Sequence, residues 1–231
     1  TSALTLAGVQ SDLLSRPEDA LATLHRARAA AENEFQETTI YDEIVETYLA
    51  AGRVNDAEKF WHAENDSTEE KEKDYVGLTK IRLAQRDLPR ARESATKIQS
   101  VLARPHWLGQ VEALLGNYAA ARKLWKEPLK DPEFDEWAFW YLWIQYHLFL
   151  RDFDRVIEKI DPVKMRAAAG GYFELAIAHA AKGDVAHAAE WVRAGRAEME
   201  RHARKSHFTS ILRDARELAV QLQISDATQQ A

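Results

Sequence analysis

A short sequence pattern recurs along the chain and restricts its possible folds more than any other feature. Each copy has a turn, a small residue five positions later and an apolar residue four positions beyond that, as in Gly52, Ala57 and Trp61. The small residues of the six copies are Ala20, Ala57, Ala91, Ala121, Val156 and Ala188. Their spacings of 37, 34, 30, 35 and 32 residues predict an array of similar structural units.

The residues on both sides of each turn have helical spacing. Tyr41, Ile44 and Tyr48 lie three and four positions apart, so they share one face of a helix. Gly52 is suited to end that helix, because a residue without a Cβ readily adopts the positive φ found at many helix C-termini. With only nine glycines and six prolines among 231 residues, the composition also favours helices, and we predict an all-α fold.

The repeating unit resembles the tetratricopeptide repeat, a helix–turn–helix unit of 34 residues. The first-helix aromatic position of that family is filled by Tyr41, Tyr75, Trp140 and Tyr172, and by Leu4 in the first unit. The small residue of the family at the helix crossing matches Gly8, Gly109 and Ala176, whereas three units have Val45, Thr79 and Ile144 there. The resemblance implies a right-handed solenoid of about six degenerate helical hairpins over residues 1–205.

Several local signals predict where individual helices begin and end. The pattern Ser67-x-x-Glu70 is a capping box, typical of a helix start. Pro105 predicts that the first helix of the fourth unit starts near His106, because proline disrupts a helix interior. Residues 206–224 are expected to form a C-terminal capping helix, followed by a polar tail over 225–231. Its apolar stripe comprises Phe208, Ile211, Leu212, Ala215, Leu218, Ala219 and Leu222.

Charge and hydropathy exclude several classes of partner. The net charge of -6 is unfavourable for binding nucleic acid, and we predict no nucleic-acid partner. The longest apolar stretch, residues 137–150, contains Gln145 and His147 and is too short to span a bilayer, so no membrane insertion is expected. The absence of cysteine does not fix the compartment. We favour the cytoplasm, with the periplasm or another extracytoplasmic space as the alternative.

No residue pattern points to catalysis, and we predict no catalytic residue, no metal site and no cofactor. His179 and His187 straddle the turn at Gly183, but they lack the spacing of a helical zinc site, so packed or solvated histidines are expected. Gly170-Gly171 is not followed by the Lys-Ser or Lys-Thr of a phosphate loop. The basic run over 201–207 is the charge that a helix C-terminus favours.

The resemblance also implies a binding surface, because the first helices of tetratricopeptide arrays line a concave face that binds peptides. Transferred position by position, the partner-binding residues are Asp42, Glu43, Glu46, Lys80, His106, Trp107, Gln110, Tyr141, Gln145, Phe149, Phe173 and Ile177. This surface is charged toward the N-terminal half and aromatic toward the C-terminal half. The Lys/Asn/Arg pattern with which chaperone-binding members hold a terminal carboxylate is not present.

The function that fits these features is a non-catalytic scaffold or adaptor that binds a protein or peptide. Homo-oligomers are also compatible with such an array. A first alternative is a ligand- or peptide-sensing regulatory domain of a larger protein, such as a transcription regulator. An enzyme built on a helical toroid is a second alternative, and it would need convergent polar groups in an enclosed pocket. An RNA-reading helical repeat is less favoured still, because it would need a basic groove.

Overall fold

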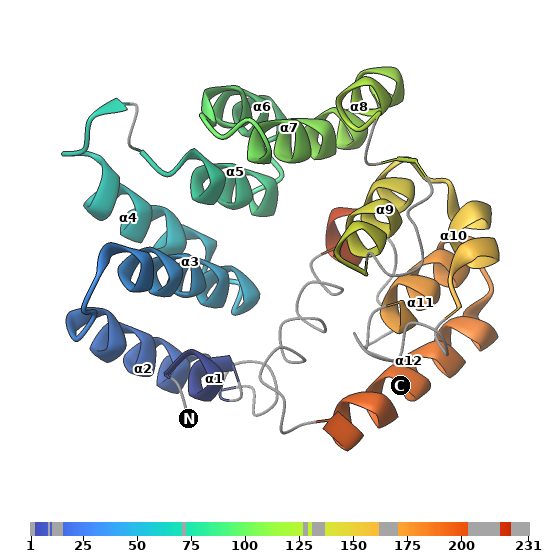
Figure 1. Cartoon of the computed structure of the whole chain (residues 1–231), viewed down its shortest axis with the longest axis horizontal. Coiled ribbons are helices and arrows are strands. Elements are labelled where there is room, and N and C mark those ends of the chain that lie inside the picture. Colours follow the sequence, from blue (N-terminus) through green and yellow to red (C-terminus); the bar gives the residue numbers. More distant parts are fainter. Residues whose placement is uncertain are drawn as a thin grey trace. The chain divides into compact units, whose positions relative to one another are not determined.

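The structure is a computed structural model of the chain, and it describes residues 3–8, 10, 16–70, 73–126, 129–130, 137–161, 171–202 and 218–222. These residues form α-helices and no β-strand, so the all-α prediction is confirmed (Figure 1). In chain order the helices are α1 (Ala3–Gly8), α2 (Pro17–Ala29), α3 (Glu34–Ala50), α4 (Val54–Asn65), α5 (Tyr75–Ala84), α6 (Leu88–Lys97), α7 (Ala103–Leu114), α8 (Tyr118–Leu124), α9 (Trp137–Phe149), α10 (Phe153–Lys159), α11 (Tyr172–Ala181) and α12 (Val185–His202).

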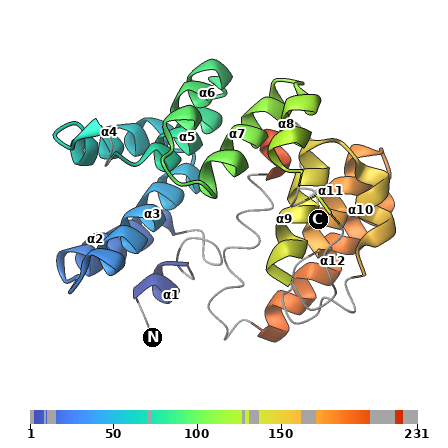
Figure 2. The same ribbon diagram turned by 45° about the horizontal axis from the view of Figure 1, so that its top comes forward.

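The chain divides into two compact units, Thr1–Trp107 and Leu108–Ala231, with the division inside α7. Within the first unit α2 packs on α3, α3 on α4, α4 on α5, and α5 on α6. Within the second unit α9 packs on α10, α10 on α11, and α11 on α12. The close pairing of α5 with α6 and of α11 with α12 is also visible in Figure 2. Helix–helix packing between chain neighbours therefore builds both units.

The same backbone turn joins the two helices of five hairpins in the described part of the chain. One residue of each turn has a left-handed conformation, with φ between 57° and 81°. These residues are Gly52, Arg86, Gly116, Arg151 and Gly183. In the first turn the N–H of Gly52 donates to Leu49 O at 2.9 Å, and the N–H of Arg53 donates to Tyr48 O at 2.9 Å. The other four turns make the same pair of bonds, so each is a Schellman motif.

The small residue of the sequence pattern lies five positions after each left-handed residue. Ala57, Ala91, Ala121, Val156 and Ala188 are all fully buried, as is Ala20 in α2. The small residue of the pattern therefore lies in the core in every described copy. Small side chains are suited to such positions because they let the neighbouring helices approach closely.

Each unit has its own hydrophobic core. In the first unit one cluster joins Leu24 of α2 to Ile44 of α3, and another joins Val45 of α3 to Trp61 of α4 and Ile81 of α5. In the second unit the indole of Trp125 stacks on the ring of Tyr146, with ring centroids 4.2 Å apart. These clusters bury the apolar faces that helices of this amphipathic kind must cover.

The expected capping segment is described only over residues 218–222. Leu218, Ala219 and Leu222 are buried there and belong to the core cluster of the second unit. The remaining expectations for this region, a helix over 206–217 and a polar tail over 225–231, fall outside the described residues. The described part of the segment therefore packs its apolar side chains inside the second unit.

Two expected helix starts are wrong. No α-helix begins at Ser67; the next one is α5, which starts at Tyr75, and its cap is Asp74, whose carboxylate accepts the N–H of Gly77. The fourth hairpin's first helix begins at Ala103 instead of His106. Pro105 is compatible with this earlier start because its missing N–H falls in the first turn, where no intrahelical partner is needed.

Candidate functional site

A chain of hydrogen bonds fixes α3, α4 and α5 relative to one another. The indole Nε1–H of Trp61 donates to Asp74 O at 2.6 Å. The N–H of Asp74 in turn donates to Asn65 Oδ1 at 2.8 Å, and Asn65 Nδ2 donates to the hydroxyl of Tyr41 at 3.1 Å. Asn65 is buried, so these bonds satisfy a polar side chain that would otherwise be costly to bury. They set the register in which α3 and α5 present their side chains.

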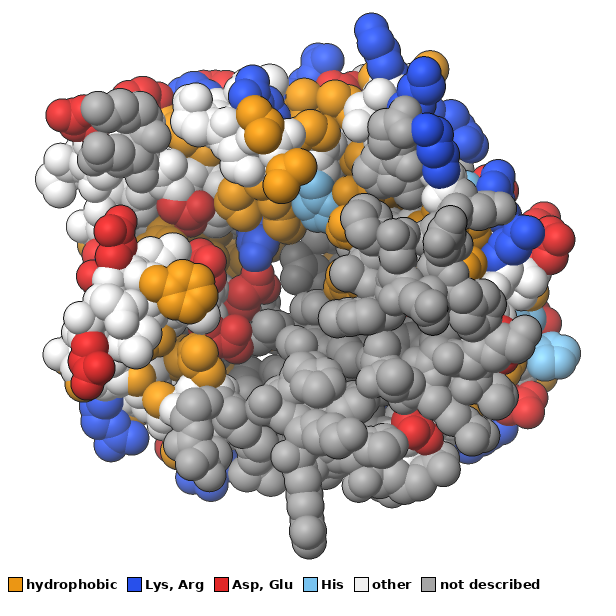
Figure 3. Space-filling model, in the orientation of Figure 1, with side chains coloured by type: hydrophobic (Ala, Val, Ile, Leu, Met, Phe, Trp, Pro, Cys, Tyr) orange, Lys and Arg blue, Asp and Glu red, His pale blue; other side chains and the backbone are white. Residues whose placement is uncertain are grey.

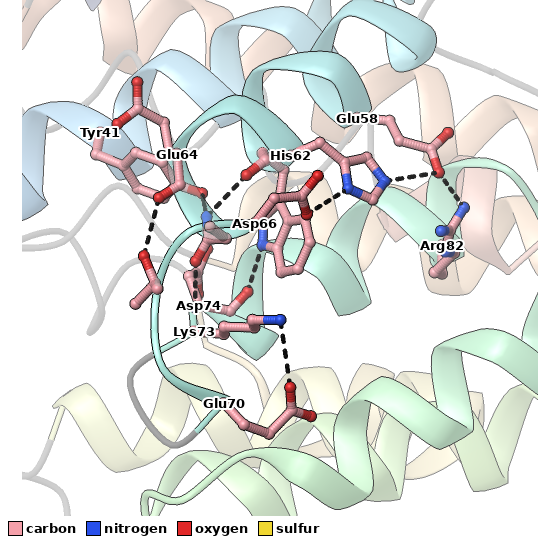
Figure 4. Close-up of polar contacts among 12 residues, drawn as sticks. Tyr41, Glu58, His62, Glu64, Asp66, Glu70, Lys73, Asp74 and Arg82 are labelled. Atoms are coloured by element: carbon pink, nitrogen blue, oxygen red, sulfur yellow. Dashed lines mark hydrogen bonds and ion pairs between the residues drawn. The ribbon is translucent and has the colours of Figure 1, made fainter.

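Ion pairs add a second link between α4 and α5, shown in Figure 4. Arg82 of α5 bonds to Glu58 of α4, with Nη1 and Oε1 2.5 Å apart. Glu58 also lies near His62, whose Nδ1 is 2.9 Å from Asp66 Oδ1 (Figure 4). The side chains of Arg82 and Glu58 are only 15% and 25% exposed, so this pair is partly shielded from solvent and orients both side chains along the α4–α5 contact.

Lys80 brings together side chains from three first helices. Its ammonium makes an ion pair with Glu46 of α3, and both side chains are largely buried, at 20% and 13% exposed. The same ammonium lies 5.3 Å from the ring centroid of Trp107 in α7, a cation–π distance. Residues that the sequence places in three different repeat units therefore meet at one point, within the first compact unit.

Two further predicted site residues, His106 and Asp42, interact electrostatically with Lys80. Burial, and to a smaller extent the charge of Lys80, lowers the pKa of His106 to about 4, so the imidazole is neutral at pH 7. The pKa of Asp42 is raised to about 6, chiefly because neighbouring protein groups displace water from one side of its exposed side chain. The carboxylates of Asp74, Glu46 and Glu43 contribute to this rise, and Lys80 opposes it. We call the set Asp42, Glu43, Glu46, Lys80, His106 and Trp107 the charged face.

The charged face has a net negative charge near neutral pH. Asp42, Glu43 and Glu46 supply three carboxylates, and Lys80 supplies one ammonium. The indole of Trp107 is half-buried and adds an apolar surface beside them. Acidic, basic and hydrophobic side chains lie side by side on the face of the first unit drawn in Figure 3. Such a surface attracts cationic groups and offers an aromatic ring for them to pack on.

The predicted site residues of the second unit are arranged differently. Gln110, Phe149, Phe173 and Ile177 are buried, so their expected contact with a partner is not available in this structure. Phe149 packs near the Trp125 ring, with centroids 6.3 Å apart, and Phe173 lies against Gly195 of α12. For the three apolar residues the reason is that α9 contacts both α10 and α11, and α11 contacts α9, α10 and α12, so both helices are covered on more than one side. Two others, Tyr141 and Gln145, are half-buried.

The structure also gathers a set of side chains that the sequence pattern did not assign to a site. His179, Asp184 and His187 have one potential ligand atom each, and these atoms all lie within 4.8 Å of one another. Their spacing of five and three residues crosses a hairpin turn, so it differs from the spacing of ligands on a single helix. The signal that could have revealed them is the turn at Gly183, which folds the two histidines back toward each other.

None of the described helices is both long and apolar enough to cross a membrane. Comparison with known proteins found no match to any protein-family model, curated protein or solved structure.

Proposed function

We propose that this chain is a non-catalytic scaffold built of tetratricopeptide-like repeats, which binds a protein or peptide partner on the charged face. The proposed array is a right-handed solenoid of about six degenerate hairpins. The five left-handed turn residues support it, because their numbers differ by 34, 30, 35 and 32 and their turns share one hydrogen-bond pattern. Units of nearly constant length with one turn geometry are what a helical repeat requires.

The meeting of Glu46, Lys80 and Trp107 carries the assignment of the binding surface. In a hairpin array the first helices of successive units form one face, and these three side chains come from α3, α5 and α7. A face that spans several repeats is suited to an extended ligand, because each repeat contributes its own contacts.

The chemistry of the charged face favours a partner segment with basic and apolar residues. Its excess of carboxylates attracts Lys and Arg side chains and speeds their encounter with the protein. Trp107 is the side chain best suited to contribute binding energy, since tryptophan is among the residues that most often dominate interfaces. The acidic residues thus select the ligand, and the ring stabilises the complex.

A library of short random peptides, selected against the full chain, tests this proposal. We expect the selected peptides to be enriched in Lys or Arg beside an apolar residue. Trp107→Ala should weaken their binding by about tenfold or more. Glu46→Gln should weaken it as well, because it removes one carboxylate of the charged face and the ion pair of Glu46 with Lys80.

The matched control is Glu93→Gln in α6, where Glu93 is exposed and pairs with Lys97. This change alters the net charge by the same amount away from the charged face. Peptide binding that falls equally in Glu93→Gln and Glu46→Gln, or that is unaffected by Trp107→Ala, would refute the assignment.

A further inference from the structure

The turn between α11 and α12 holds two imidazoles around one carboxylate. His179 lies in the last turn of α11, and its Nδ1 is 3.0 Å from Asp184 Oδ2. His187 lies in the first turn of α12, and its Nδ1 is 2.7 Å from the same oxygen. The two ring centroids are 5.2 Å apart. Three potential ligand atoms therefore lie close together: one from His179 of α11, one from His187 of α12, and one from Asp184 in the turn between these helices.

The backbone of the turn fixes these groups. Gly183 has a φ of 79°, and the N–H of Asp184 donates to His179 O at 2.9 Å, which closes the Schellman motif. The N–H of His187 donates to Asp184 Oδ1 at 3.2 Å. Since Oδ1 is held by the backbone, Oδ2 is directed toward both rings. A ligand carboxylate held through its second oxygen is typical of well-ordered metal sites.

We propose that His179, Asp184 and His187 bind a divalent first-row transition metal, of which Zn²⁺ is the natural probe. Imidazole nitrogen and carboxylate oxygen are the donors that such ions accept, whereas Mg²⁺ and Ca²⁺ prefer oxygen alone. Three protein ligands leave at least one position for water. The site is therefore a surface metal site whose coordination is completed by solvent.

The distances suit this ion after a small adjustment. Zinc–ligand distances of about 2.1 Å in a tetrahedral site place neighbouring ligand atoms about 3.4 Å apart. To reach that separation from the observed 3.0 and 2.7 Å, the Nδ1 atoms of His179 and His187 must move away from Asp184 Oδ2 by about 0.4 and about 0.7 Å. His187, whose side chain is 61% exposed, has room to move, while His179, at 14% exposed, is the fixed ligand. Asp184 is 39% exposed, so the ion can enter from solvent.

Metal binding requires each histidine to carry its proton on Nε2, which leaves Nδ1 free to ligate. This choice of tautomer leaves the backbone bonds of the turn in place.

The preceding hairpin provides an internal comparison. His147 and Asp152 occupy the same turn positions, 32 residues earlier, and His147 Nδ1 lies 3.1 Å from Asp152 Oδ2. The position equivalent to His187 is Arg155, whose guanidinium lies 5.7 Å from the ring of Trp143. Because arginine is always protonated in proteins, it cannot serve as a ligand. The two turns therefore differ in the third position, where Arg155 leaves a histidine–aspartate pair and His187 supplies a third potential ligand.

A bound ion would link α11 to α12 across their turn and stabilise the hairpin that α12 completes. Isothermal titration of the full chain with Zn²⁺ alone, in chelator-treated buffer, tests the site. Wild-type protein should bind Zn²⁺ and unfold at a higher temperature in its presence. In His187→Ala the affinity should fall by more than the roughly 10–100-fold that loss of an outer-shell partner costs.

The matched control is His62→Ala, because His62 also pairs with an aspartate, at 2.9 Å from Asp66 Oδ1, but in the first unit. This variant should bind Zn²⁺ as the wild type does. Since His187 is exposed, His187→Ala should keep the wild-type circular dichroism and the wild-type unfolding temperature without metal. Absence of Zn²⁺ binding in the wild type, or equal binding in wild type and His187→Ala, would overturn the proposal.

Discussion

Replacing Arg86 by glycine should stabilise the protein, although it removes a side chain and introduces the most flexible residue. Arg86 has a φ of 58° in the turn between α5 and α6, where the equivalent residues of three other hairpins are glycines. The left-handed conformation brings the Cβ of an L-residue too close to the backbone. Because the Arg86 side chain is exposed, its loss removes no core packing.

The expected gain is the difference between two effects. The left-handed conformation costs a non-glycine residue about 1–2 kcal/mol. Glycine raises the entropy of the unfolded chain, which opposes this gain by about 0.4–1 kcal/mol. Arg86→Gly should therefore raise the free energy of unfolding by about 0.5–1 kcal/mol. The reverse change, Gly52→Ala, should lower it by a similar amount, since a Cβ there would meet no atom within 4 Å and only the backbone conformation penalises it.

Urea denaturation followed by circular dichroism measures both changes as shifts in the transition midpoint. The control is Arg92→Gly, because Arg92 is also exposed but lies inside α6. Glycine in a helix interior costs about 1 kcal/mol, so this variant should be destabilised. If Arg86→Gly were destabilised as much as Arg92→Gly, the shared left-handed turn would not describe this hairpin in solution.

Three further predictions concern packing and pH. Gly109→Ala would place a methyl group within the Trp125 indole and should destabilise the chain by about 1–3 kcal/mol despite its higher helix propensity, as denaturant midpoints would show. Ala57→Leu should cost about 1–3 kcal/mol in the same assay, because Ala57 is fully buried; an unchanged midpoint would contradict this packing. The pKa of Asp42 is raised to about 6, so the folded chain holds this proton more tightly than the unfolded chain, and stability should fall as pH rises from about 4 to 6. Since Asp42 is exposed, we expect the effect to stay below about 1 kcal/mol and to vanish in Asp42→Asn.

The sequence predicted the hairpins well because their turns and small residues are local features. A glycine before a second helix indicates a left-handed turn, as at Gly52, Gly116 and Gly183. The same conformation at Arg86 and Arg151 could be inferred only from their positions in the repeat, since arginine has no preference for positive φ. Ser67 shows the opposite case, in which a local capping signal does not start an α-helix and Asp74 caps the following one instead.

Helical periodicity identifies residues that share a helix face, and the resemblance to the tetratricopeptide repeat assigns Glu46, Lys80 and Trp107 to equivalent first helices. Periodicity does not determine how many neighbours cover that face, and for this reason Phe149 and Phe173 are buried in the core. The proximity of the histidines around Asp184 depends on the path of a turn, which helix periodicity does not describe.

The most direct test of the proposed function is hydrogen–deuterium exchange of the full chain with and without a selected basic peptide. Binding at the charged face predicts slower amide exchange in α3, in α5 and at the start of α7, because these helices carry Glu46, Lys80 and Trp107. Exchange in the second helices α4 and α6 should change less. Protection confined to α4 and α6, with α3 and α5 unaffected, would contradict the proposal that the first helices bind the partner.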